Sequence, residues 1–175
     1  MLIELLKLER LKVGVMDEGT AIGSVYRTVV NPDELKIIGF MIKIGNLMPK
    51  LKAISFFDVV DIDQHGLAIH SRENIADATE VVRLNELVHK KYSLIGQTIK
   101  TKSGKKIGRV SDALAETTTG DILRIYSKSL ISDFVFERSQ IEKVTLNEVI
   151  VKNIGPKGAK VDKKAVSAEK LAEAA

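Results

Sequence analysis

An internal repeat is the feature of this sequence that most constrains its fold. Segment 19–25, Gly-Thr-Ala-Ile-Gly-Ser-Val, is matched by segment 104–110, Gly-Lys-Lys-Ile-Gly-Arg-Val, at an offset of 85 residues. At the same offset Ile38 and Phe40 fall on Leu123 and Ile125. After a three-residue contraction, Val59, Ile62, Leu67 and Ile69 fall on Ile141, Val144, Val149 and Val151. Self-similarity at a fixed offset indicates copies of one folding unit, here two copies of about 60 to 70 residues.

Within each copy the apolar residues alternate with other residues. In the first copy Ile38, Phe40, Ile42 and Ile44 share one face of an extended segment. Alternation is the period of a half-buried strand, and short strands separated by turn residues indicate a small antiparallel barrel or sandwich. We therefore expect a mainly β chain made of two small antiparallel β-barrels in tandem.

Four glycines recur in the two copies and are expected to serve backbone geometry. Gly19 and Gly104 follow polar residues, which predicts the positive φ of a hairpin turn. Gly23 and Gly108 interrupt strand patterns, which predicts a bulge or a tight bend.

A helix is predicted between the copies. Asp77 and Glu80 have the spacing of a capping box, and the apolar residues Val81, Leu84, Val88 and Tyr92 follow at helical spacing. This apolar stripe should pack on one or both barrels.

These patterns divide the chain into four parts. We place the first barrel at residues 1–72, the linker helix at 73–92, the second barrel at 93–154 and a flexible tail rich in Ala, Lys and Glu at 155–175. The tail is too short to form a stable isolated helix in water.

Composition narrows the environment of the protein. The chain has no cysteine, which excludes disulfides, thiolate metal sites and a cysteine nucleophile and suits a reducing compartment. Its longest apolar run, Ile37–Ile42, is far shorter than the ~20 residues that span a bilayer. Glu4 and Glu9 interrupt the N-terminal apolar stretch, so no signal peptide is expected. We expect a cytoplasmic protein without a membrane span.

The second copy carries a recognisable pattern: Leu94-Ile95-Gly96, then Ser-Gly-Lys-Lys-Ile-Gly-Arg-Val at 103–110, then Gln140-Ile141. This pattern resembles the PRC-barrel family, which is named after the photosynthetic reaction-centre subunit that carries the fold. The first copy is similar through Gly19–Val25, Asn31-Pro32 and Ser55–Val60. The resemblance extends from about residue 2 to residue 153.

The resemblance implies two PRC-type barrels joined by a helix and a role as a docking surface. The family also includes the C-terminal domain of a ribosome-maturation factor and some archaeal proteins linked to cell division. It has no catalytic motif to transfer, so the resemblance implies no active-site residue.

Two loops, Gly45–Lys52 and Ser129–Phe134, are candidates for binding a partner protein because apolar residues gather around them. The candidate docking residues are Leu47, Met48, Leu51, Phe56, Leu130, Ile131 and Phe134. Alternatively, Phe56 or Phe57 closes the end of a barrel. The sequence thus favours a non-enzymatic protein-binding adaptor whose partner is not identified.

A basic stretch without any acidic residue supports a second hypothesis, an RNA- or ribosome-associated factor. Its cations are Lys90, Lys91, Lys100, Lys102, Lys105, Lys106 and Arg109. They would contact RNA phosphates or an acidic partner, or else they protect an exposed strand edge. Only Tyr92 adds an aromatic ring nearby, whereas single-strand platforms use several.

The sequence has no pattern typical of a calcium-binding loop, a zinc site or a phosphate-binding loop. Asp58, Asp61 and Asp63 lie among valines and lack the terminal Glu of a calcium-binding loop. The three histidines lack zinc-site spacing, and Lys105 lacks the flanking residues of a phosphate-binding loop. We expect no enzyme activity, no catalytic residue, no metal, no cofactor and no small-molecule substrate.

Overall fold

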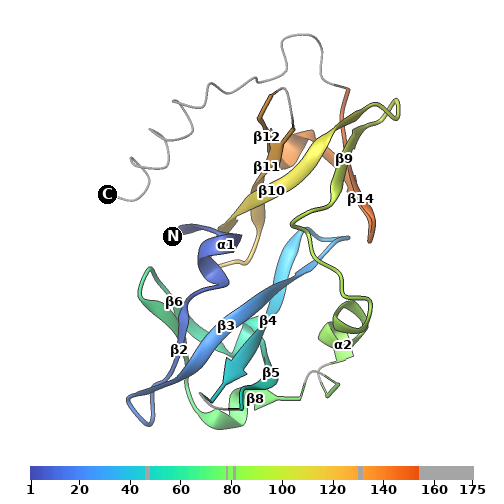
Figure 1. Ribbon diagram of the computed structural model, residues 1–175. Helices are drawn as coiled ribbons and strands as arrows, with labels where there is room; N and C mark the ends of the chain where they lie inside the picture. Colours follow the sequence, from blue (N-terminus) through green and yellow to red (C-terminus); the bar gives the residue numbers. More distant parts are fainter. Residues whose placement is uncertain (46–47, 78, 81, 130–131, 154–175) are drawn as a thin grey trace.

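The computed structural model describes residues 1–45, 48–77, 79–80, 82–129 and 132–153, and this part of the chain is mainly β (Figure 1). The predicted tail, 155–175, lies outside the described residues. The strands of the N-terminal half are β1 (Leu2–Glu4), β2 (Lys12–Val15), β3 (Thr20–Asn31), β4 (Lys36–Ile44), β5 (Lys50–Ser55), β6 (Val59–Ile62), β7 (Gly66–Ile69) and β8 (Ile75–Ala76). Those of the C-terminal half are β9 (Thr98–Thr101), β10 (Lys106–Glu116), β11 (Ile122–Lys128), β12 (Phe134–Glu137), β13 (Ile141–Val144) and β14 (Glu148–Val151). The α-helices are α1 (Leu5–Leu8) and α2 (Val82–His89), and the 3-10 helices are η1 (Phe56–Asp58), η2 (Arg72–Asn74) and η3 (Arg138–Gln140).

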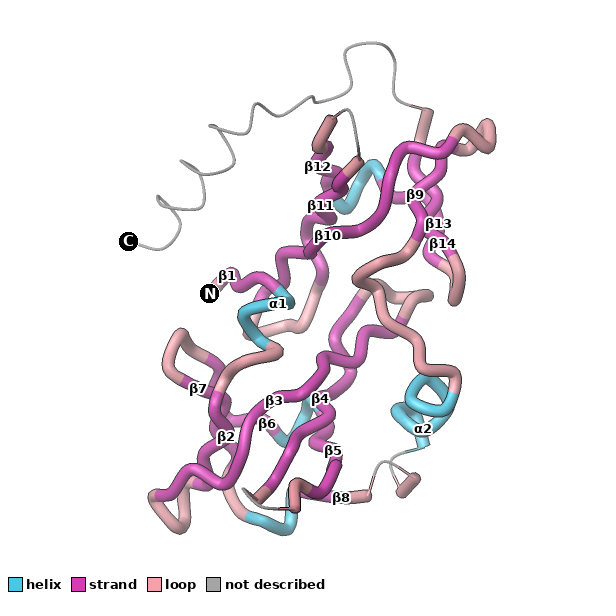
Figure 2. The backbone as a smooth tube through the Cα atoms, viewed as in Figure 1, coloured by secondary structure: helices cyan, strands magenta, loops and turns pink. Residues whose placement is uncertain are grey.

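The strands form two sheets with the same order. One runs β6-β7-β2-β3-β4-β5-β8, and the other runs β12-β11-β10-β9-β14-β13 with β1 added to β10. Read from its β13 end, the second sheet has the order β13-β14-β9-β10-β11-β12, in which each strand is the copy of the corresponding strand from β6 to β5; β8 has no described counterpart. The strands twist and curl as in half of a barrel (Figure 2).

The repeat predicted from the sequence is confirmed by the strand register. In β3–β4, Val25 pairs with Ile42 and a bulge follows; in β10–β11, Val110 pairs with Ser127 and the same bulge follows. The β6–β7 and β13–β14 hairpins share a bulge in the same way. The two halves therefore share the pairing register and the bulges of these strands.

The expectations for the repeated glycines are also confirmed. Gly19 has φ of 60° and Gly104 of 86°, the left-handed region that favours glycine. A Cβ on Gly23 would lie 2.0 Å from the Lys43 carbonyl oxygen, and one on Gly108 would lie 2.8 Å from that of Lys128. Only glycine admits this close strand approach.

A symmetric contact joins the two sheets. The Ile37 N–H donates to the Gly120 carbonyl at 2.8 Å, and the Ile122 N–H donates to the Leu35 carbonyl at 3.0 Å. Ile122 and Gly120 are the repeat counterparts of Ile37 and Leu35, at the offset of 85 residues, so each bond is the counterpart of the other. An antiparallel bridge between Lys36 and Asp121 lies between the two bonds. The halves therefore meet across a local pseudo-two-fold axis.

Both sheets also contribute to one hydrophobic core. Phe40 of β4 and Phe136 of β12 are fully buried, and a single buried cluster extends from Ile3 to Val151. Each side chain of this size stabilises the fold by about 1.5 to 3 kcal/mol when it leaves water. The two halves are thus packed against each other through shared apolar surface.

The N-terminal strand crosses to the other half of the molecule. β1 pairs antiparallel with β10, and the Leu6 N–H donates to the Asp112 carboxylate at 3.3 Å. In the N-terminal half, α2 lies where β1 lies in the C-terminal half. Leu87 and Val88 of α2 pack on Val29 of β3.

The linker helix is shorter than the sequence pattern predicts. α2 begins at Val82, and Tyr92 follows its end as a buried residue. Glu80 accepts the Asp77 N–H, which is one of the two bonds of a capping box, and the Asp77 carboxylate forms an ion pair with Lys52 at 2.8 Å. Both residues precede the first residue of α2, so the described helix is shorter than the segment 73–92 that the sequence predicts. No helix among the described residues has the length and hydropathy to cross a membrane.

The contact between the halves can be tested at Gly120, with Gly19 as the matched control. Both have positive φ, but nothing surrounds a Cβ on Gly19, whereas one on Gly120 would lie 3.1 Å from the Ile37 carbonyl oxygen and 3.1 Å from Phe56. We expect Gly19→Ala to lower the free energy of unfolding by about 1 kcal/mol and Gly120→Ala by about 2 to 4 kcal/mol. Urea denaturation measures both, and equal losses would contradict the close contact.

Candidate functional site

The hairpin between β4 and β5 exposes apolar side chains at its described positions. Met48 is 86% exposed and Leu51 is 49% exposed. β5 pairs with β8 only through Ala53 and Ile54, so the half of β5 that carries Leu51 has no described strand on its outer side. Leu51 and Met48 are therefore available to a partner.

The two candidate phenylalanines pack inward. Phe56 is half-buried, packs on the core and lies 6.3 Å from the Phe40 ring. Phe134 is half-buried and stacks 6.2 Å from Phe136. The neighbouring residue Phe57 is instead exposed, with a relative accessibility of 82%. Of the two residues that could close the end of a barrel, Phe56 is the one that packs on the core.

The remaining docking candidates, Leu47, Leu130 and Ile131, lie outside the described residues. The structure thus brings Met48 and Leu51 together on one hairpin, while Phe56 and Phe134 serve the core.

The basic stretch divides into two groups. Lys90, Lys100 and Lys102 form ion pairs with Glu86, Glu148 and Glu142. Glu142 raises the pKa of Lys102 above its ordinary value through a 2.6 Å hydrogen bond. Glu142 and Glu148 are distant from the basic stretch in the sequence, whereas Glu86 lies on α2, just before it. These carboxylates neutralise the charges of the three lysines.

The other four cations of the basic stretch have no acidic partner among the described residues. They are Lys91, Lys105, Lys106 and Arg109. All four are exposed. Lys105 and Lys106 lie at the β9–β10 turn, whereas Lys91 and Arg109 line a shallow depression of about 400 Å³ that Tyr92 also borders.

Tyr92 is buried, yet its hydroxyl has no hydrogen-bond partner among the described residues. Burial, together with the nearby Asp33 carboxylate, raises the pKa of the Tyr92 phenol above its ordinary value. The ring therefore stays neutral and contributes through packing.

The aspartate cluster of the β6–β7 turn is structural. The Asp63 carboxylate accepts the N–H groups of His65 at 2.7 Å and Gly66 at 2.9 Å. These bonds lower the pKa of Asp63. Within the described residues, no group of three His, Asp or Glu side chains is arranged to hold a metal ion.

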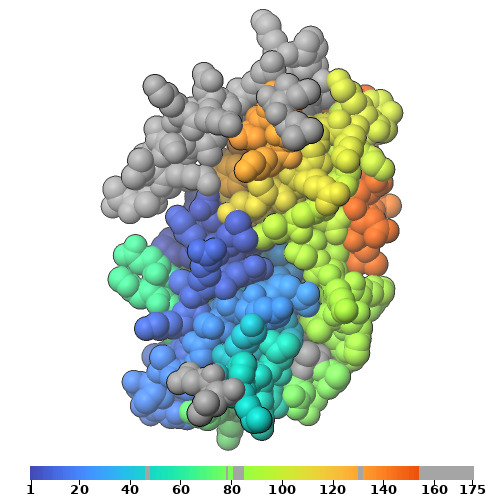
Figure 3. Space-filling model, viewed as in Figure 1, coloured from blue at the N-terminus to red at the C-terminus, as the bar shows by residue number. Residues whose placement is uncertain are grey.

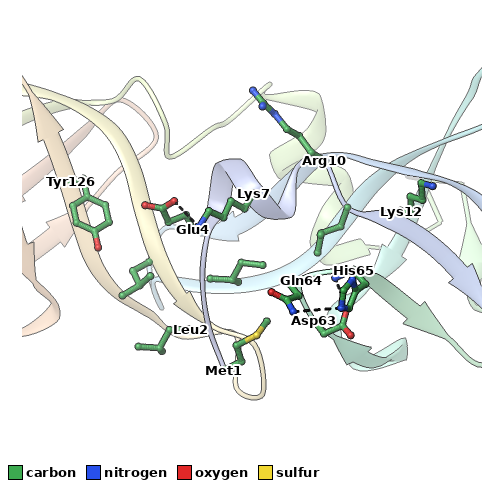
Figure 4. Close-up of a pocket in the computed structure, with 13 residues that line it drawn as sticks. Met1, Leu2, Glu4, Lys7, Arg10, Lys12, Asp63, Gln64, His65 and Tyr126 are labelled. Atoms are coloured by element: carbon green, nitrogen blue, oxygen red, sulfur yellow. Dashed lines mark hydrogen bonds and ion pairs between the residues drawn. The ribbon is translucent and has the colours of Figure 1, made fainter. Parts of the chain in front are cut away.

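The structure reveals a cleft that the sequence analysis did not identify. It has a volume of about 810 Å³ and lies between the N-terminal segment and the β6–β7 turn (Figure 4). Lys7, Arg10 and Lys12 line it together with His65. No strong sequence signal marks this cleft, because Glu4 and Glu9 alternate with these cations and the opposite wall is some 50 residues away.

No protein-family model matches this chain, and no match is found among the curated proteins.

The buried hydroxyl of Tyr92 generates a prediction. Because no described residue forms a hydrogen bond with the hydroxyl, we expect Tyr92→Phe to keep the free energy of unfolding at pH 7 or raise it by up to about 1 kcal/mol. Ionisation favours the unfolded chain, since the folded pKa is raised. The native protein should therefore lose stability relative to Tyr92→Phe as the pH rises above about 10, the ordinary tyrosine pKa.

Urea denaturation across this pH range tests the prediction. Tyr26→Phe is the control, because Tyr26 is 48% exposed. A loss of 1 kcal/mol or more in Tyr92→Phe at pH 7 would instead indicate a hydrogen-bonded hydroxyl, by about the net value of one such bond.

Proposed function

We propose that the protein is a non-enzymatic protein-binding adaptor that captures its partner through the β4–β5 hairpin. The observation that carries this proposal is the exposure of Met48 in the β4–β5 loop and of Leu51 on the incompletely paired strand β5. Exposed neighbouring apolar side chains favour association because a partner removes them from water.

The proposal includes the finer architecture. Each sheet corresponds to one PRC-type barrel, and α2 is the linker between them. The common strand order and common bulges of the two sheets support this assignment. The absence of cysteine agrees with a cytoplasmic location.

The hairpin can be tested by capture from native cytosol treated with ribonuclease. We expect the native chain to retain a partner that Met48→Ser/Leu51→Ser loses, because two buried apolar contacts are worth about tenfold or more in affinity. Mass spectrometry identifies and quantifies the bound protein.

Met16→Ser/Val60→Ser is the matched control, since these side chains are also exposed, at 56% and 55%, but lie elsewhere. The control should retain the partner. Equal capture by the hairpin variant and the native chain would refute the role of the hairpin.

One observation favours a second candidate function, RNA binding. Lys91, Lys105, Lys106 and Arg109 present positive charge that no described carboxylate neutralises. Unpaired cations can replace the counterions of RNA phosphates, and such binding weakens steeply with salt.

RNA binding would depend on only part of the basic stretch. If Lys105 and Lys106 contact phosphates, Lys105→Gln/Lys106→Gln should reduce the slope of log affinity against log salt by about 1.4 for a single-stranded probe. Lys100→Gln/Lys102→Gln should change it less, because these lysines are already ion-paired. Fluorescence anisotropy with a labelled RNA of about 20 nucleotides measures the slopes. Equal slopes in both variants would contradict this division.

A further inference from the structure

The cleft beside the N-terminal segment is built from both halves of the chain. Met1–Glu4, Lys7 and Arg10–Lys12 border it, the turn 63–65 forms the facing wall, and Leu114 of β10 and Tyr126 of β11 close it. Figure 3 shows the N-terminal residues, in blue, and the β6–β7 region, in green, on the same side of the molecule. Its volume of about 810 Å³ is in the range of ligand-binding clefts, about 300 to 1,000 Å³.

The lining is apolar at one end and cationic at the other. Met1 and Leu2 lie at one end in Figure 4, and Leu2 is 39% exposed. Arg10 and Lys12 lie toward the opposite end, and the turn of Gln64 and His65 lies between the two. A ligand that fits must therefore carry an apolar group and negative charge at separate positions.

The carboxylates of the cleft are already engaged. Asp63 accepts two backbone N–H groups of its own turn, and Glu4 pairs with Lys7 at 3.6 Å. Arg10 and Lys12 are exposed and have no acidic partner among the described residues. The cationic end thus has charge left for a ligand.

Among the described strands β1 pairs only with β10, which leaves its other edge open toward the cleft. The Thr117 N–H donates to the Met1 carbonyl, and the Glu116 N–H is directed to Asp121 rather than to Leu2. In an antiparallel pair hydrogen-bonded and non-hydrogen-bonded pairs alternate, so the N–H and C=O of Leu2 face away from β10. An extended peptide can pair with such an edge.

The other half of the molecule provides an internal comparison. There α2 occupies the place of β1, and the corresponding space is divided into depressions of about 580 and 400 Å³. The combination of a free edge, an apolar end and a cationic end is specific to the N-terminal cleft.

We propose that this cleft binds an extended acidic segment of a partner protein, with an apolar side chain beside Leu2 and carboxylates beside Arg10 and Lys12. The peptide backbone pairs with β1, and the charges fix its direction. The site is separate from the β4–β5 hairpin, and the proposal does not depend on it.

The experiment uses the full chain and a phage-displayed library of random peptides of about 12 residues, a length sufficient for one extended strand. Enriched sequences should combine apolar with acidic residues. For the most enriched peptide, labelled with fluorescein, we expect Arg10→Glu/Lys12→Glu to weaken binding about tenfold or more in fluorescence polarisation. Leu2→Ser should weaken it as well. In nuclear magnetic resonance spectra, the amides of Leu2 and His65 should shift.

Three controls keep the result specific. Lys128→Glu/Lys152→Glu makes the same change of net charge at exposed positions outside the cleft and should leave the affinity within about twofold. Met48→Ser/Leu51→Ser should also bind normally, which separates this proposal from that for the hairpin. Thermal unfolding verifies that each variant is folded.

Several outcomes would overturn the proposal. These are the absence of any enriched peptide, enrichment without acidic residues, unchanged binding by Arg10→Glu/Lys12→Glu, or amide shifts confined to the β4–β5 hairpin. A shift of the same amides by decanoate without peptide binding would overturn it in favour of a small amphiphilic carboxylate.

Discussion

The reciprocal pairing of the turns before β4 and β11 is the constraint on which the rest of the structure depends. The paired backbone bonds of Ile37 with Gly120 and of Ile122 with Leu35 hold the two curled sheets against each other. Each sheet curls around only part of its apolar surface, so Phe40 and Phe136 are buried in a core that both sheets share. A small curled sheet of this size has little interior of its own, and shared burial provides the missing stabilisation.

The differences between the two copies mark where function is expected. The strand order and bulges that both halves share show what the fold requires, and a residue or element that breaks the symmetry is free to serve another purpose. β1 stands where the other half has α2, and this exchange opens the N-terminal cleft. Phe57 and Val60 are exposed where the second copy has Ser139 and Glu142, so the apolar character there is not needed for folding. The proposed protein-binding role draws on such asymmetric features.

Local patterns predicted much of the fold. Alternating apolar residues predicted the strands, and the repeated glycines predicted positive φ at Gly19 and Gly104, because these signals depend on neighbours in the chain. Sites were harder to predict. Phe56 was selected as a docking residue but packs on the core, and Lys102 was selected as a binding cation but is paired with Glu142, 40 residues away. Neither partner could be identified from local sequence.

The sequence by itself determined the repeat, the strand periodicity and the glycine turns, since each follows from spacing along one segment. Only the tertiary structure decided that β1 joins the sheet of the C-terminal half, that Asp77 forms an ion pair with Lys52, and that a cationic cleft forms beside His65. The physical reason is that hydrogen-bond and charge partners are chosen by proximity in space. A periodic pattern specifies which face of a strand is buried, but it does not specify which distant segment covers that face.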